Sequence, residues 1–93
     1  MFPKDIARIA VFAIKNSEWK TADLLIDELY GWMDDYDLTT GIAADRISRA
    51  IMEVMSEKGK DVAELQNQNK FLKRAVFLTL YAKNSGVYNT ASR

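Results

Sequence analysis

The sequence contains no cysteine and no histidine, and these two absences remove most of the chemistry that protein sites commonly use. Without cysteine the chain can form neither a disulfide nor a thiol nucleophile. Without histidine it lacks the commonest general base and the commonest transition-metal ligand. Its glycines are isolated, so there is no Gly-rich phosphate loop, and no histidine can activate a serine or threonine hydroxyl. We therefore expect no enzymatic activity, no cofactor and no metal site.

Turn-forming residues and long apolar runs are also scarce. One proline and four glycines are too few for many turns, and the apolar–polar alternation of β-strands is absent. The longest apolar runs, "IAVFAI" and "AVFLTLYA", are far shorter than the ~20 residues that span a bilayer. The start of the chain lacks the pattern of a signal peptide. We therefore expect a cytoplasmic protein with no membrane contact.

Apolar residues recur at helical spacing in four stretches of the 93-residue chain. The predicted helices run over 3–15, from Ser17 or Thr21 to Met33, over 41–58 and over 61–83. The pattern predicts an all-α fold over residues 1–84, a single small bundle-like domain of about four helices with no sheet. Residues 85–93 have little periodicity and are predicted to form a flexible C-terminal tail. Gly31 lies inside the second predicted helix, which suggests a close helix crossing there.

The formal net charge is zero, but acidic and basic residues are separated along the chain. Residues 21–45 contain seven acidic residues and no basic one, whereas residues 65–93 contain five basic residues and no acidic one. Two interpretations remain open: the stretches pack side by side, within one chain or between subunits, or one of them faces an outside partner. The acidic residues are Asp23, Asp27, Glu28, Asp34, Asp35, Asp37 and Asp45.

The acidic segment that follows the second predicted helix is a candidate partner-binding surface. Asp34, Asp35 and Asp37 lie near the carboxyl end of that helix, where the helix dipole disfavours negative charge. The compensating cation could be Arg46 or Arg49 of the same chain, or a basic surface on a partner. We include these three aspartates among the predicted protein-interaction residues.

The last predicted helix is a second candidate surface, because its second half is apolar on nearly every side. Residues 62, 65, 69, 72, 76 and 79 follow coiled-coil spacing, with Asn69 at a position where asparagine can determine the oligomeric state. The run is under three heptads, which favours a bundle helix over a free-standing coiled coil. One broad apolar face of this half is predicted to consist of Phe71, Leu72, Ala75, Val76, Leu78 and Ala82. The side opposite this face carries a basic–aromatic stripe with an adjoining leucine. The predicted interaction residues there are Lys70, Arg74, Phe77, Leu80 and Tyr81.

A small domain can seldom cover one helix completely, so this surplus apolar face predicts burial by another chain. A homodimer is the simplest such arrangement. A basic–aromatic stripe could also stack on single-stranded nucleic acid, which we rank below a protein contact.

Residues 6–59 carry a different pattern, in "IARIAVFAIKNSEWKTADLLIDEL" followed by "GIAADRISRAIMEVMSEKG". This layout resembles the helical half of winged-helix and other helix-turn-helix domains. The resemblance implies a DNA-binding transcription regulator whose 41–58 helix lies in a major groove. Arg46, Ser48 and Arg49 would then be the likeliest DNA contacts.

The sequence as a whole favours a small regulatory protein that binds a protein partner and self-associates through its last helix. A compact, cysteine-free chain of this size is typical of phage and mobile-element accessory proteins or inhibitors. DNA binding through the 41–58 helix is the alternative hypothesis.

Overall fold

The computed structural model describes residues 1–57 and 62–88, and these residues form helices and turns with no strand. This confirms the predicted all-α fold. The four helices are α1 (Pro3–Lys15), α2 (Trp19–Tyr30), α3 (Leu38–Glu57) and α4 (Val62–Asn84). None of them is long and apolar enough to cross a membrane.

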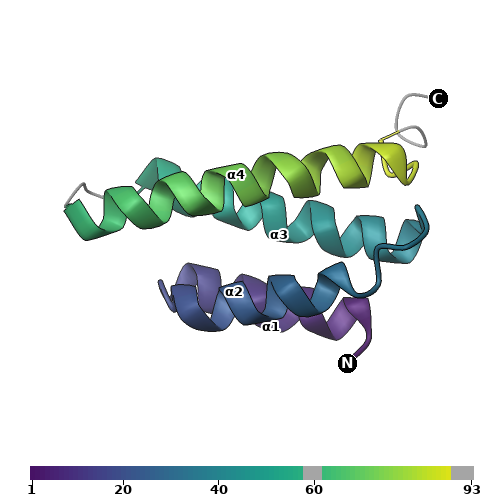
Figure 1. Ribbon diagram of the computed structural model, residues 1–93, viewed down its shortest axis with the longest axis horizontal. Coiled ribbons are helices and arrows are strands. Elements are labelled where there is room, and N and C mark those ends of the chain that lie inside the picture. Colours follow the sequence, from purple (N-terminus) through teal and green to yellow (C-terminus); the bar gives the residue numbers. More distant parts are fainter. Residues whose placement is uncertain (58–61, 89–93) are drawn as a thin grey trace.

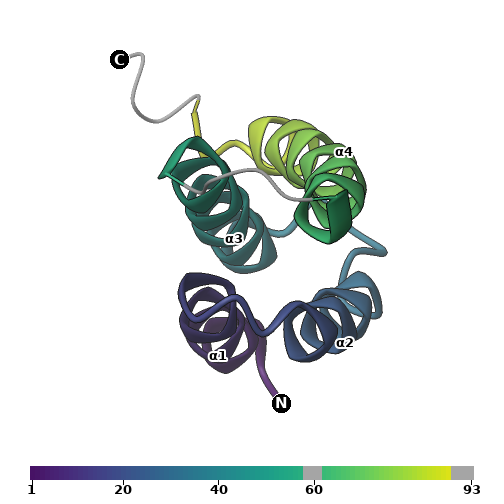
Figure 2. The ribbon, with the colours of Figure 1, turned by 90° about the vertical axis from the view of Figure 1, so that its left-hand side faces the viewer.

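The helices form two layers, with α1 beside α2 and α3 beside α4 (Figure 1). Viewed from one end, they occupy the corners of a square in which α1 lies diagonally opposite α4 (Figure 2). The closest packing joins α1 to α2, α1 to α3, and α3 to α4. The chain alternates in direction from helix to helix, so α2 and α4 run parallel across one side of the square (Figure 1).

The core combines branched and aromatic side chains with many alanines. Alanine on α1 and α3 lets these two helices approach closely, while isoleucine and phenylalanine fill the centre. On α4 the buried stripe is Phe71, Ala75, Leu78 and Ala82, which recur at helical spacing. The core residues of α1 and α3 are Ile6, Ala7, Ala10, Ala13, Ile14, Ala43, Ala44, Ile47, Ala50, Ile51 and Val54.

The link between α2 and α3 lies three residues earlier in the chain than the sequence pattern predicted. After Tyr30 the chain tightens into a turn and leaves the α-helix before the predicted end at Met33. Asp37 then caps α3, because the Gly41 N–H donates to its carbonyl at 2.8 Å and the Thr39 N–H to its carboxylate at 3.4 Å. α3 therefore begins at Leu38, three residues before the predicted start at Gly41.

The sequence pattern suggested a close helix crossing at Gly31, but the close approach in the structure is at Gly41. Gly31 is exposed at the end of α2, whereas Gly41 is buried inside α3. A Cβ atom at Gly41 would lie 2.6 Å from the Ser85 Cβ and 3.1 Å from the Val87 Cγ2. Gly41 therefore marks the point where the turn after α4 lies directly on α3.

Residues 85–88 form that turn, and Val87 and Tyr88 pack against the core. Residues 85–88, the first part of the predicted tail, thus contribute to the packing of the domain. Two predictions fall outside the described residues: residues 89–93 of the predicted tail and the predicted end of the third helix at Lys58.

Candidate interaction surfaces

The basic half of the predicted stripe on α4 lies against acidic residues of α2. Arg74 places its Nη2 atom 2.8 Å from Asp23 Oδ1 and 3.0 Å from Asp27 Oδ1. Lys70 Nζ lies 3.0 Å from the other Asp23 oxygen. We call this contact between the two parallel helices the α2–α4 seam. Here the acidic and basic stretches pack side by side within one chain, so Lys70 and Arg74 already have intramolecular partners.

The aromatic half of the stripe continues the same seam. The Arg74 guanidinium lies over the Tyr30 ring, 5.4 Å from its centre, and the Phe77 ring packs edge-on against Tyr30 at 5.4 Å. Tyr81 is buried, and its hydroxyl donates to the backbone carbonyl of Asp35. Tyr81, which the sequence assigned to an interaction surface, thus belongs to the interior of its own chain.

Local negative charge keeps Arg74 protonated, and burial keeps the Tyr30 hydroxyl neutral. Burial alone would lower the pKa of Arg74, but the hydrogen bond to Asp27 and nearby negative charge raise that pKa above its ordinary value. Burial raises the pKa of the Tyr30 hydroxyl, although Arg74 opposes the shift. The seam is therefore held by a cation that stays protonated over the whole physiological pH range.

The three predicted aspartates of the α2–α3 link differ in role. Asp37 is the cap of α3, and the backbone of Asp35 accepts the Tyr81 hydrogen bond. All three side chains are exposed, and those of Asp34 and Asp35 form no ion pair with another described residue. Arg49 does not compensate for them, because its Nε lies 2.9 Å from Asp45.

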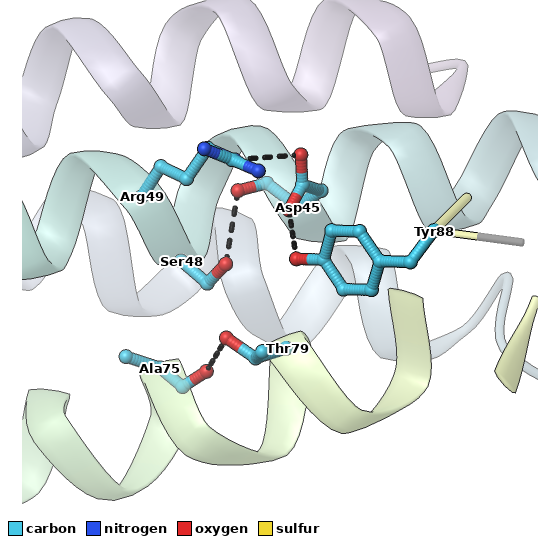
Figure 3. Close-up of polar contacts among 6 residues, drawn as sticks. All are labelled: Asp45, Ser48, Arg49, Ala75, Thr79 and Tyr88. Atoms are coloured by element: carbon cyan, nitrogen blue, oxygen red, sulfur yellow. Dashed lines mark hydrogen bonds and ion pairs between the residues drawn. The ribbon is translucent and has the colours of Figure 1, made fainter. Parts of the chain in front are cut away.

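The three predicted DNA contacts on α3 also differ in their accessibility. Ser48 is buried, and its hydroxyl donates to the Asp45 carbonyl at 2.9 Å (Figure 3). Arg49 is tied to the Asp45 carboxylate, which also accepts a hydrogen bond from Tyr88 (Figure 3). Arg46 is exposed and has no ion pair within the described residues. The chain thus uses Ser48 for internal packing and leaves Arg46 available to an external ligand.

Two of these tyrosines should make the fold sensitive to alkali. Burial raises the pKa of Tyr81 above 10.0, and the hydrogen bond to Asp45 followed by burial does the same for Tyr88. A raised folded-state pKa gives stability that is complete below the unfolded-state pKa and is lost as pH rises above it. We expect the urea midpoint to fall between about pH 9 and about pH 11.5, and to fall less in Tyr81→Phe/Tyr88→Phe. An equal fall in both proteins would contradict this prediction, because the lysines titrate in both.

The outer face of α4 remains uncovered. Most of the coiled-coil positions identified in the sequence face away from the core: Val62 is 76% exposed and Val76 59%, whereas Leu72 and Thr79 are half-buried. Leu65 and Leu80 are also exposed, and Asn69 lies among them. We call Val62, Leu65, Asn69, Leu72, Val76 and Leu80 the outer row of α4. Toward its carboxyl end the row borders a groove of about 270 Å³ lined by Met52, Ala75, Val76, Thr79 and Leu80.

A second uncovered surface lies between α1 and α3, and sequence reasoning missed it. Lys4, Arg8, Phe12 and Lys15 follow one another at one-turn steps along α1, and they face α3 across a groove that also contains Arg46. The spacing was visible in the sequence. It was overlooked because the apolar residues between these positions took part in the core pattern.

The described residues include no group of three or more cysteine, histidine or acidic side chains placed to hold a metal ion. Comparisons of the chain with models of known protein families, with curated proteins and with solved structures find no match.

Proposed function

We propose that the chain is a small, non-catalytic regulatory protein that acts by binding proteins and that self-associates through the outer row of α4. The single observation that carries this proposal is the coexistence of two apolar stripes on α4. One stripe is covered by the protein's own helices, and the other follows coiled-coil spacing as far as Val76 and is mostly exposed.

The outer row fits a second copy of the same helix. It spans the 19 residues from Val62 to Leu80, about 27 Å along the axis. Met52 widens the apolar surface at one end, and Phe77 is partly exposed beside it. Asn69 interrupts the row with one polar side chain, as register-determining asparagines do in paired helices. The same surface on both copies gives a closed, symmetric dimer.

Helix-turn-helix function receives less support from the arrangement of α3. That helix is packed between α1 and α4, and nine of its twenty residues are buried. A recognition helix needs an exposed face that can enter a DNA groove. Protein binding therefore remains the first hypothesis.

Sedimentation equilibrium tests self-association directly. We expect the wild-type chain to form dimers in the micromolar range, and Val76→Glu/Leu80→Glu to weaken the dimer by at least about a hundredfold, because two buried carboxylates would meet an apolar partner. The control is Leu24→Glu, which changes a leucine on α2 that is at least as exposed as Leu80. A wild-type chain that stays monomeric up to near-millimolar concentration would make the proposal wrong.

Salt provides a second criterion for the same dimer. The row is flanked by Lys73 and Lys83, and residues 65–88 contain no acidic side chain. Two copies therefore bring like charges together at the edges of an apolar contact, and added salt should strengthen the dimer.

A further inference from the structure

The groove between α1 and α3 combines apolar walls with basic rims. Its main part has a volume of about 540 Å³ and is lined by Arg8, Ile9, Val11, Phe12, Lys15 and Arg46. A smaller part of about 220 Å³ is lined by Lys4, Ala7, Thr39, Ile42, Ala43 and Arg46. Arg46 belongs to both parts, so together they form one surface, the basic groove.

Most of the positive charge of the basic groove is not compensated by carboxylates of the described residues. Four cationic side chains line it and no carboxylate does. Among these four cations only Arg8 has an ion pair within the described residues, an exposed contact of 3.8 Å to Asp5. Phe12 is 66% exposed although it lies between Arg8 and Lys15, so a large apolar ring and several cations face solvent together. A surface of this kind is complementary to a ligand that is acidic and apolar at once.

We propose that the basic groove binds an acidic amphipathic helix of a partner protein. A nucleic acid backbone would satisfy the cations but offers no apolar face to Phe12 and Ile42. Stacked bases need several aromatic platforms, and Phe12 is the only aromatic residue in the lining. A membrane surface is flat and does not fill a concave groove. A helix laid along the groove satisfies both the charge and the apolar walls.

The spacing of the cations specifies the ligand further. Lys4 and Lys15 are 11 residues apart on α1, which corresponds to about 16 Å or three helical turns. The partner segment should therefore be about three turns long. It should carry carboxylates at one-turn intervals on one flank and a large apolar side chain that reaches the exposed edge of Phe12.

The test uses fluorescence anisotropy with a labelled, capped peptide of about 14 residues that has glutamate on one flank and leucine on the other. A matched peptide has lysine in place of each glutamate. We expect the acidic peptide to bind at least about tenfold more tightly, with an affinity that falls as salt is added. Arg46→Glu should weaken binding at least about tenfold, whereas Lys20→Glu, at an exposed lysine of α2, should leave it unchanged within about twofold.

Three outcomes would overturn the proposal. The first is equal binding of the acidic and basic peptides, or no binding of either. The second is tighter binding of random duplex DNA that Arg46→Glu abolishes, which would make nucleic acid the occupant. The third is loss of self-association in Arg46→Glu, which would assign the groove to a second copy. The dimer through α4 should strengthen with salt while peptide binding weakens, so failure of either proposal can be distinguished from failure of the other.

Discussion

Replacing Arg74 with methionine should lower the free energy of unfolding by about 2–3 kcal/mol, because it leaves Asp27 without its cation and Asp23 with only the exposed Lys70. The Arg74 side chain is only 18% exposed and Asp23 is 23% exposed, so water replaces little of the lost interaction. Removing one partner of a fully buried ion pair costs about 3–5 kcal/mol, and the greater exposure of Asp27 reduces that figure here. Urea denaturation at neutral pH gives the measurement.

Lys70→Met is the matched control, since Lys70 binds the same Asp23 from an exposed position. Exposed ion pairs contribute about 0–1 kcal/mol, so this variant should unfold close to the wild-type midpoint. If both methionine variants lost the same stability, the ranking of these two contacts by burial would be wrong.

Gly41→Ala should destabilise the fold by about 1–3 kcal/mol, although alanine favours helix formation more than glycine does. The new methyl group would overlap Ser85 and press on Val87, and both belong to the turn that follows α4. That turn must move away from α3, and the Tyr88 contact with Asp45 moves with it. Thermal and urea unfolding measure the loss.

Two further variants separate this steric effect from helix propensity. Gly31→Ala adds the same methyl group where the nearest atom, the Glu28 carbonyl oxygen, is 3.3 Å away, so its stability should stay near wild type. Gly41→Ala/Ser85→Gly removes the Ser85 side chain and should recover much of the loss. A double variant as unstable as Gly41→Ala would show that the overlap with Ser85 is not the cause.

The existence of four helices could be predicted from periodicity alone, but their ends depended on caps. The sequence pattern placed the start of α3 at Gly41, because "DLTTG" has the composition of a loop. In the structure Asp37 is the cap, and the helix includes Leu38, Thr39 and Thr40. A segment with an aspartate two residues before a threonine pair is compatible with a loop and with a helix start equally well. Only the position of the neighbouring helices decides between them.

The sequence pattern placed the buried residues of α4 on one broad apolar face together with Leu72 and Val76, but it could not say how much of that face is covered. Val62, Leu65, Leu72 and Val76 have the same spacing as the buried Phe71, Ala75, Leu78 and Ala82. Periodicity identifies stripes but does not say which of two stripes is covered. The charge pattern indicated part of the orientation of α4, because Asp23 and Asp27 are four residues apart, as are Lys70 and Arg74. Pairing within one chain was one of two open interpretations of the charge pattern. The same stripe was therefore also predicted to bind a partner protein.

The α2–α4 seam has a consequence for how α4 is oriented. Three contacts across the seam share one offset of 47 positions between the two parallel helices: Asp23 with Lys70, Asp27 with Arg74, and Tyr30 with Phe77. Because α4 has two apolar stripes, turning it by roughly a third of a revolution about its axis would bury the outer row and expose the present core stripe. Such a rotation would break all three contacts at once. The seam therefore selects one of two rotational settings of α4, and with it determines which stripe a second molecule can reach.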